Sequence, residues 1–409
     1  MLYQFHELQH AAMNPLMQWA DAVSHLFSSA VSPLAYTPFS QSVAAGAELM
    51  YRIGKDYKKP SFNIDSITVN GRLVAIEEEV VSDKPFCKLL HFSKQLASQE
   101  QAALAQPKLL VVAPLSGHHA TLLRDTVRVL LHEHDVYITD WTDARMVPLS
   151  EGAFHLHDYV FYVQEFIRQL GPDVHVLAIC QPTVPVLGAV SLMATAGDIQ
   201  PRSMILMGGP IDGRKSPTEV NKLAMEKPFA WFEETVIDVV PFNYPGAGRR
   251  VYPGFLQHAG FIAMHPEKHM QSYIDFYENR AHGHPVDAHL KFYDEYNAVL
   301  DMAAEFYLET IKVVFQDFAL ANGTWEVDGK LVRPQDVKHV ALLTVEGGQD
   351  DICGIGQTQA AHTLCKSIPK SKKLHHAEPE CGHYGIFSGR RWREHIYPVV
   401  SAFIRANNG

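Results

Sequence analysis

Several features that would place a chain in a special class of protein are missing from this sequence. Its 409 residues include five scattered cysteines and no C-x-x-C pair, which argues against a disulfide framework and for a reducing compartment. No stretch approaches the ~18 consecutive apolar residues of a membrane span. The N-terminus lacks the basic segment and apolar core of a signal peptide. With a net charge of −10 and no long Lys/Arg run, a nucleic-acid partner is not expected either. We therefore expect a soluble, cytoplasmic protein.

The order of apolar patterns predicts an α/β protein. Apolar residues recur at helical spacing over residues 1–60. From residue 64 the period changes to two, and Asn70-Gly71 is typical of a tight turn between two strands. Continuous apolar runs then alternate with helical stretches, which predicts a mostly parallel sheet covered by helices. The five clearest runs span residues 108–114, 135–141, 173–179, 202–208 and 338–345.

The region between the last two runs has a different composition. Nineteen of the 42 aromatic residues lie in residues 215–335, where helical patterns replace buried strands. We expect an aromatic-rich helical cap over residues 214–335, inserted into a core formed by residues 61–213 and 336–409. Residues 1–60 would form a separate N-terminal helical segment. Ordinary core packing within a helical subdomain explains the aromatic residues equally well.

One cysteine stands where a nucleophile would be presented. Cys180 ends the apolar run 173–179, and ligands of open α/β sheets bind at the carboxyl ends of strands. A helix is expected to begin at Gln181 or Pro182, because the first helical turn tolerates a missing N–H. Ala178 fits the small-residue requirement of a nucleophile elbow, whereas Pro182 replaces its second glycine. A lone cysteine at a strand end is more often structural, so further residues must support a catalytic role.

Candidate partners for Cys180 follow later in the chain. Asp350 and Asp351 come directly after a predicted strand and a glycine-rich turn, and His383 precedes the last amphipathic helix. The sequence order of Cys180, Asp350 and His383 is that of nucleophile, acid and histidine in α/β-hydrolases. We favour Asp350 over Asp351 from its spacing to the preceding glycine. Together the three residues predict a catalytic triad.

Other candidate site residues are assigned from their neighbourhood. The backbone N–H groups of Gln181 and Ser116 are expected to form an oxyanion hole, with Leu115 as an alternative to Ser116. Candidate substrate-binding side chains are His118, Trp231, Phe232, Tyr252 and Phe255. A zinc cluster of His375, His376, Cys381 and His383 is the competing interpretation, but its spacing matches no paired-ligand pattern. We expect neither a metal ion nor a cofactor.

Several long motifs carry a family resemblance over nearly the full chain. They are MLYQFHELQHAAMNPLMQWADA, PLSGHHATLLRDTV, AICQPTVPVLGAV, VYPGFLQHAGFIAMHPEKH, FYDEYNAVLDMAAEFYLETI, TVEGGQDDICGIGQT and ECGHYGIFSGRRW. In these motifs the chain resembles intracellular polyhydroxyalkanoate depolymerases of the poly(3-hydroxybutyrate) type. The resemblance implies an α/β-hydrolase fold with a cysteine nucleophile. It assigns Cys180 as nucleophile, His383 as base and Asp350 as its orienting acid.

The resemblance also implies partners and rivals. The expected substrate is a polyester granule in the cytoplasm, cleaved through a thioester to 3-hydroxybutyrate or oligomers, with water or coenzyme A as acyl acceptor. A homo-oligomer is compatible with the sequence. Polyhydroxyalkanoate synthases share the fold and the cysteine, but their elbow resembles G-x-C-x-G, whereas this chain has Ala178 and Pro182. A non-catalytic granule-binding protein is the alternative outside enzymes.

Overall fold

A long twisted sheet organises the molecule. The computed structural model describes residues 2–37, 39–69, 71–97, 104–264 and 266–409. Within these residues a nine-stranded sheet has the order β1-β2-β3-β5-β4-β6-β7-β13-β14. Its strands are β1 (Ser66–Val69), β2 (Arg72–Lys84), β3 (Cys87–Lys94), β4 (Lys108–Val112), β5 (Asp135–Trp141), β6 (His175–Ile179), β7 (Ser203–Met207), β13 (Ala341–Gly347) and β14 (Lys373–Glu378).

The way in which neighbouring strands pair changes once along the sheet, from antiparallel to parallel. β1, β2, β3 and β5 pair antiparallel in succession, and β5, β4, β6, β7, β13 and β14 pair parallel. This crossover order, with the helices on both faces, is the α/β-hydrolase fold, so the predicted fold class is confirmed. The five predicted apolar runs all contain strands. Val69 pairs with Arg72 across the predicted hairpin turn, of which Asn70 lies outside the described residues.

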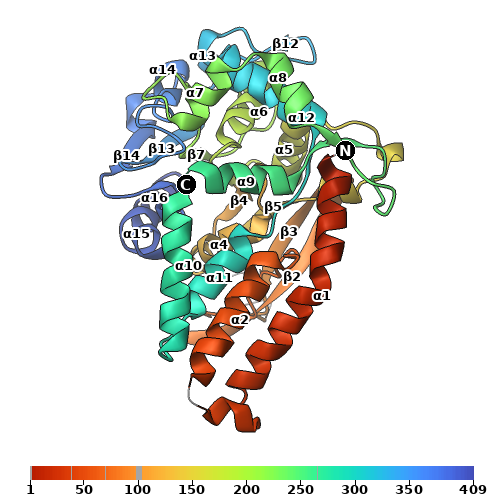
Figure 1. The fold of residues 1–409 in the computed structure, drawn as a ribbon. Coiled ribbons are helices and arrows are strands. Elements are labelled where there is room, and N and C mark those ends of the chain that lie inside the picture. The colour runs from red at the N-terminus through yellow and green to blue at the C-terminus, as the bar shows by residue number, and fades with distance from the viewer. Residues whose placement is uncertain (1, 38, 70, 98–103, 265) are drawn as a thin grey trace.

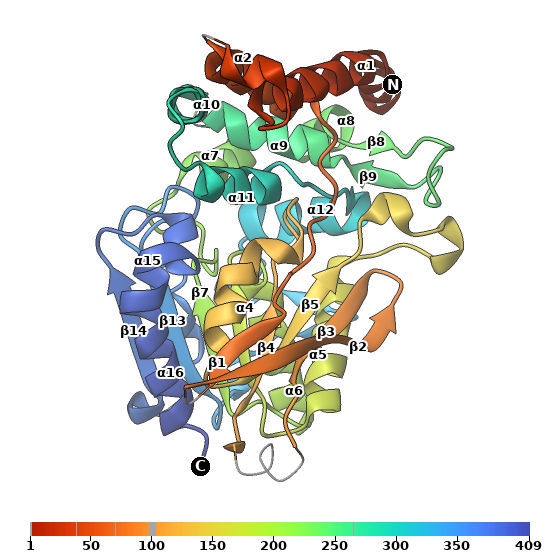
Figure 2. The ribbon, with the colours of Figure 1, turned by 90° about the horizontal axis from the view of Figure 1, so that it is seen from below.

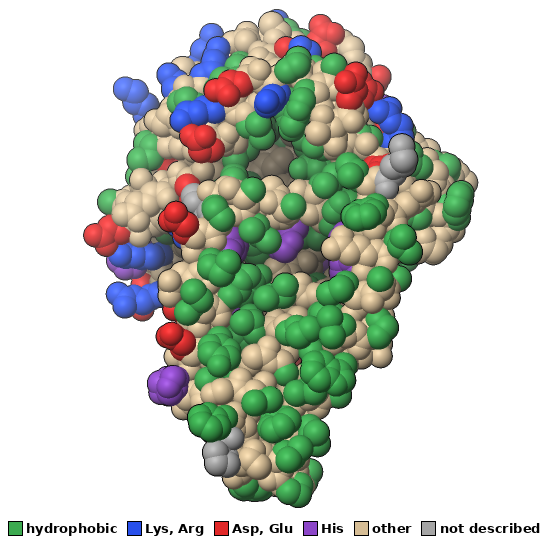
Figure 3. Space-filling model, in the orientation of Figure 1, with side chains coloured by type: hydrophobic (Ala, Val, Ile, Leu, Met, Phe, Trp, Pro, Cys, Tyr) green, Lys and Arg blue, Asp and Glu red, His purple; other side chains and the backbone are tan. Residues whose placement is uncertain are grey.

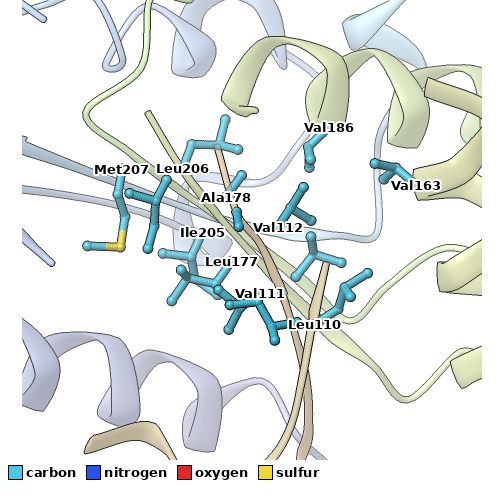
Figure 4. Packing of buried hydrophobic residues seen from close by; sticks show 14 of the residues in the cluster. Leu110, Val111, Val112, Val163, Leu177, Ala178, Val186, Ile205, Leu206 and Met207 are labelled. Atoms are coloured by element: carbon cyan, nitrogen blue, oxygen red, sulfur yellow. The ribbon is translucent and has the colours of Figure 1, made fainter. Parts of the chain in front are cut away.

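Helices cover both faces of the sheet (Figures 1 and 2). On one side lie α5 (Leu156–Leu170) and α6 (Thr183–Ala196), and on the other lie α4 (Arg124–Leu130) and α16 (Tyr397–Ala406). Two short helices, α14 (Ala361–Leu364) and α15 (Gly389–Arg391), follow β13 and β14 in the chain. Figure 4 shows apolar side chains of the central strands packed against Val163 of α5 and Val186 of α6. Each fully buried aliphatic side chain of this kind contributes about 1.5–3 kcal/mol.

An insertion between β7 and β13 rises over the carboxyl ends of the strands. Its helices are α7 (Glu219–Glu226), α8 (Phe229–Thr235), α9 (Gly254–Met264), α10 (Pro266–Ala281), α11 (Asp287–Tyr296), α12 (Ala304–Thr310) and α13 (Ala319–Asn322). Its short strands are β8 (Asp238–Val239), β9 (Arg250–Tyr252), β10 (Met302–Ala303), β11 (Glu326–Val327) and β12 (Lys330–Leu331). The proposed unit boundaries at residues 60, 213 and 335 stay a prediction.

Two N-terminal helices form the outermost layer beyond the insertion. α1 (Leu2–Ser28) and α2 (Ser40–Gly54) run side by side, and Figure 2 places them outside α9 and α10. Arg52 of α2 binds Asp294 of α11 at 3.0 Å, which joins this layer to the insertion. None of the described helices combines the length and apolar character that crossing a membrane requires.

Candidate active site

Cys180 lies on a strained turn between β6 and α6. Its φ of 68° is in the left-handed region, which a non-glycine residue adopts at a cost of about 1–3 kcal/mol. The Cys180 N–H donates to the carbonyl of Met207 in the neighbouring strand at 2.7 Å, and α6 begins at Thr183. The helix therefore starts slightly later than the prolines suggested. The turn points a half-buried thiol outward from the end of the strand.

The other cysteines are enclosed by the protein. Cys87, Cys353, Cys365 and Cys381 are all buried. Burial raises the pKa of Cys365 to about 12 and that of Cys381 to about 11, and it raises the pKa of Cys353 well above its ordinary value. Cys353 also borders the cavity described below, but its thiol stays protonated at neutral pH. Among the described cysteines, Cys180 is the one suited to nucleophilic chemistry.

Asp350 and His383 form a buried pair. His383 Nδ1 lies 2.8 Å from Asp350 Oδ2, and both side chains are almost fully buried. The other carboxylate oxygen of Asp350 accepts the N–H groups of Ile352 and Cys353 at 2.9 and 2.8 Å. Asp351, the alternative acid, is half-exposed and pairs with Lys268 at 3.3 Å instead. The structure thus orients Asp350, rather than Asp351, toward the histidine.

The groups around His383 raise the pKa of its imidazole. Burial by itself would lower the pKa of His383, but the carboxylate of Asp350 and the sulfur of Cys180 outweigh burial and raise that pKa well above its ordinary value. Asp350 also forms a hydrogen bond with the ring, through Nδ1 at 2.8 Å. The structure therefore pairs His383 with Asp350 and places Cys180 and His383 at the same cavity.

A second acid holds the loop that carries Asp350. Glu346 is buried near the end of β13, and its carboxylate accepts the N–H groups of Gly356, Thr358 and Gln359 at 2.8–2.9 Å. Three such bonds fix the loop that follows the strand. The sequence did not single out Glu346, because an acid inside a strand run gives no signal of what it binds.

A cavity of about 640 Å³ opens at Cys180 and His383. Ser116, Gln181, His118, Phe232 and Tyr252 line it, as the sequence suggested. Most of its remaining wall is apolar and comes from the inserted helices, including Leu223, Phe261, Met264, Phe306, Tyr307, Ile311 and Phe315. Tyr384 and Phe387, close to His383 in the sequence, also line the cavity. Sequence reasoning missed these residues, although the position of Tyr384 next to His383 was a usable signal.

Two of the proposed substrate-binding residues lie elsewhere. Trp231 and Phe255 are not among the described residues that line the cavity. Trp231 packs edge-on against Phe232 at 5.0 Å between ring centroids. Phe255 stacks on His6 of α1 at 3.9 Å. The expectation that both line the site is thus not met, because cap packing turns their rings toward other helices.

His118 offers the cavity a neutral ring. One of its ring nitrogens lies 3.1 Å from the carbonyl oxygen of Tyr296, and its ring stacks on Phe261 at 5.2 Å. Burial, helped by the charge of nearby His258, lowers the pKa of His118 to about 4. At neutral pH the ring is therefore uncharged and suited to contact with a neutral ligand.

Several polar groups at the cavity have no partner in the described chain. The backbone N–H groups of Leu115, Ser116 and Gln181 donate to no described acceptor. Gln181 is 9% exposed as a residue, and both polar atoms of its side-chain amide are buried without a hydrogen bond within the described chain. Unpaired buried polar groups are costly, so their concentration at Cys180 indicates a site built for an oxygen-rich ligand.

The histidine-rich C-terminal segment does not converge on one point. His375 Nδ1 lies 2.9 Å from Thr344 Oγ1, His376 lies 3.8 Å from Glu378, and His383 binds Asp350. Residues that could hold a metal ion occur elsewhere. His155, His157 and Glu309 bring one ligand atom each within 4.8 Å of one another. They are not among the described residues that line the cavity.

Comparison with solved structures returns proteins of low sequence identity. A putative lipase from Acinetobacter baumannii AYE is 14% identical, with coverage of 82% of this chain and 93% of that one and a TM-score of 0.43. The 2-hydroxy-6-oxo-6-phenylhexa-2,4-dienoate hydrolase from Rhodococcus sp. strain RHA1 is 12% identical, with coverage of 81% and 99% and a TM-score of 0.44. No curated protein sequence matches the chain.

A family model gives the specific match. Residues 208–408, which contain Asp350, His383 and the whole insertion between β7 and β13, match the model described as PHB de-polymerase C-terminus. The matched region begins one residue after β7, so it takes in most of the cavity wall. This agrees with the resemblance carried by the sequence motifs. The chain belongs to the PHB depolymerase family.

Proposed function

We propose that the protein cleaves the ester bonds of poly(3-hydroxybutyrate) through a thioester on Cys180, with His383 as general acid and base and Asp350 as the orienting acid. The observation that carries the proposal is the placement of the Cys180 thiol, on a turn with positive φ, at a cavity that also contains the Asp350-paired His383. The apolar wall of the cavity suits an aliphatic polyester. The family match supports a polyester hydrolase as the broader activity.

The first half of the reaction forms the thioester. The proton of Cys180 passes to His383, and the thiolate attacks an ester carbonyl carbon. The N–H groups of Gln181 and Ser116 stabilise the resulting oxyanion, an effect worth ~3 kcal/mol for one donor. The C–O bond then breaks, and His383 donates its proton to the departing alkoxide. The leaving chain ends in a hydroxyl, and a 3-hydroxyacyl group remains on Cys180.

The second half releases the acyl group. His383 takes a proton from water, and the oxygen attacks the thioester carbonyl. The C–S bond breaks and returns the thiolate, so a 3-hydroxy acid or a short oligomer leaves. The raised pKa of His383 favours this cycle, because a more basic imidazole takes up the proton of Cys180, and later a proton of water, more readily.

Unpaired polar groups in the cavity support an ester substrate. A polyester presents a carbonyl oxygen at every repeat unit, and the Gln181 amide has no partner within the described chain. An ester carbonyl of the bound chain could accept a hydrogen bond from that amide. A purely hydrocarbon ligand would leave the amide unsatisfied.

The test is incubation with amorphous poly(3-hydroxybutyrate) granules, with and without coenzyme A, followed by identification of the products. Free acid or oligomers without coenzyme A support hydrolysis. Coenzyme A thioesters formed in its presence would instead identify a thiol as the acceptor. Chain extension from 3-hydroxybutyryl-coenzyme A would favour a synthase-like acyltransferase. Granule binding without turnover would favour a non-catalytic granule protein.

The cysteine assignment has its own control. Cys180→Ala should abolish cleavage while the protein stays folded. Cys353→Ala, which removes the neighbouring buried thiol, should keep most of the activity. The opposite pattern would overturn the proposed nucleophile.

A further inference from the structure

The N-terminal helices expose an unusual amount of apolar surface. Of the 29 large hydrophobic residues exposed in the described chain, 13 lie between Leu2 and Ile53. Phe5, Leu8 and Trp19 are 66%, 69% and 59% exposed. Together with Leu16 and Leu26, they form a series along α1. Successive members of this series are three, eight, three and seven residues apart, and these spacings place them on one face of a helix. α1 thus carries an apolar stripe directed to solvent, beside the side that it buries.

This surface carries little charge. Residues 2–54 contain four charged side chains, namely Glu7, Asp21, Glu48 and Arg52. Glu48 and Arg52 pair with each other and with Arg280 and Asp294 of the insertion. Anionic phospholipid headgroups and nucleic acids are attracted by exposed Lys or Arg, of which residues 2–54 offer none outside that network. The matching partner is a neutral apolar material.

The apolar stripe is connected to the cavity through α9. Phe255, in the first turn of α9, packs against Tyr3 and His6 of α1 at 5.5 and 3.9 Å between ring centroids. Phe261 and Met264, further along the same helix, line the cavity. One helix of eleven residues therefore touches α1 on one side and the active-site cavity on the other.

Figure 3 shows both features on one face of the molecule. Hydrophobic side chains gather over α1 and α2 in the lower part, and a hollow opens above α9. Charged side chains lie mainly around the upper rim and along one edge of this face. A flat solid that contacts the two helices would therefore also face the hollow.

The N-terminal layer is also anchored. The hydroxyl of Tyr3 donates to Asp301 Oδ2 at 2.7 Å in a buried position, and the N–H of Tyr3 donates to Asp238 at 2.9 Å. The N–H of Gly254, at the start of α9, donates to the other oxygen of Asp301 at 2.8 Å. The carboxylate of Asp301 thus binds both α1 and α9 and fixes the position of one helix relative to the other.

We propose that the exposed face of α1 and α2 is the docking surface for the solid polyester, and that it holds the cavity mouth against the granule. This inference rests on the proposed function for the identity of the solid. Adsorption through the apolar stripe would raise the local concentration of polymer chains at the cavity. Soluble esters would not need the stripe.

The test compares an insoluble substrate with a soluble one. The variant Phe5→Ser/Leu8→Ser/Trp19→Ser replaces the most exposed large side chains of the α1 stripe. In co-sedimentation with protein-free amorphous poly(3-hydroxybutyrate) granules, we expect its dissociation constant to rise at least about tenfold. Granule hydrolysis should fall accordingly. Hydrolysis of a soluble 3-hydroxybutyrate trimer should keep the wild-type kcat/KM.

A matched variant controls for general loss of surface hydrophobicity. Leu73→Ser/Val80→Ser/Ile199→Ser changes three exposed apolar residues outside the N-terminal layer and should bind granules like the wild type. If the α1 triple variant does not fold, Phe5→Gln/Trp19→Gln carries the same comparison with a smaller change.

Three results would overturn the inference. Wild-type granule binding by the α1 variant would show that another surface docks. A wild-type dimer that the α1 variant converts to a monomer, measured by light scattering, would make the face an interface between two copies. Preferential binding to phosphatidylcholine vesicles would point to a lipid surface. If instead the wild type binds granules through α1 but cleaves neither substrate, the docking surface stands and the proposed function fails.

Discussion

The exchange Asp350→Asn tests the role of the acid, because the structure dictates how the new side chain must sit. One carboxylate oxygen of Asp350 accepts the N–H groups of Ile352 and Cys353, and the other faces His383 Nδ1 at 2.8 Å. The asparagine carbonyl will stay with the two N–H groups, so its NH₂ must face the histidine. Two donors then oppose each other unless Nδ1 gives up its proton. The ring is thereby forced to carry its proton on Nε2, where it can no longer accept one from Cys180.

The magnitude follows from that geometry. Locking the wrong tautomer in a triad costs about 10³- to 10⁴-fold in kcat, which corresponds to ~4–5.5 kcal/mol. The free energy of unfolding should fall by about 1.5–3 kcal/mol, since a hydrogen bond to a charged group is lost. Asp350→Ala should cost about 1–3 kcal/mol more, because it leaves the two N–H groups without an acceptor.

The neighbouring acid gives the control. Asp351→Asn removes one charge from the next residue of the same loop, but Asp351 pairs with the exposed Lys268. Its kcat on a soluble 3-hydroxybutyrate trimer and its urea denaturation midpoint should stay near wild type. Equal losses of kcat in the two asparagine variants, or a full kcat in Asp350→Asn, would refute the reasoning.

Three further predictions concern the same site. Because the pKa of His383 is raised in the folded protein, its protonation stabilises the fold fully below about pH 6.5, and this stabilisation is lost as the pH rises through the folded-state pKa. The free energies of unfolding of wild type and His383→Gln, measured with urea, should therefore converge at alkaline pH. Gly209→Ala should destabilise the protein by about 1–3 kcal/mol in thermal unfolding, because a Cβ there would overlap Thr183 and the turn at Cys180. Gln181→Leu should raise the Tm, since it removes an unsatisfied buried amide, and should raise the KM for oligomers roughly two- to tenfold.

Each of these three predictions has an outcome that would contradict it. A constant stability difference between wild type and His383→Gln across the pH range would mean that the histidine has no raised pKa. Gly260→Ala, where a Cβ would meet no atom within 4 Å, is the control for the glycine exchange and should not destabilise. An unchanged KM in Gln181→Leu would remove the amide from substrate recognition.

Continuous apolar runs predicted the parallel part of the sheet, because strands buried on both faces tolerate few polar residues. β14 was missed for the same reason. It lies at the sheet edge, and His375 and His376 on it are only half-buried, so the segment has no apolar run. Cys180 could be singled out because a strand end followed by prolines restricts the chain to a turn and a helix start.

The cap residues were harder to place from sequence. Phe232 lines the cavity while its neighbour Trp231 does not, and this depends on how α8 rotates against the other inserted helices. Phe255 faces α1, which is some 250 residues away in the chain. Such long-range packing leaves no trace in local periodicity. The partners of Asp350 and of Glu346 were hidden for the same reason, since both acids bind backbone N–H groups of folded loops.

The most direct measurement of the central claim is detection of the covalent intermediate. The wild-type protein, acid-quenched during turnover of a 3-hydroxybutyrate oligomer, is digested and its peptides are analysed by mass spectrometry. The account predicts a 3-hydroxyacyl thioester on the peptide that contains Cys180, and none on the corresponding peptide of Cys180→Ser. Product release by wild type with the acyl group on another residue, or by Cys180→Ala at a near-wild-type rate, would contradict it.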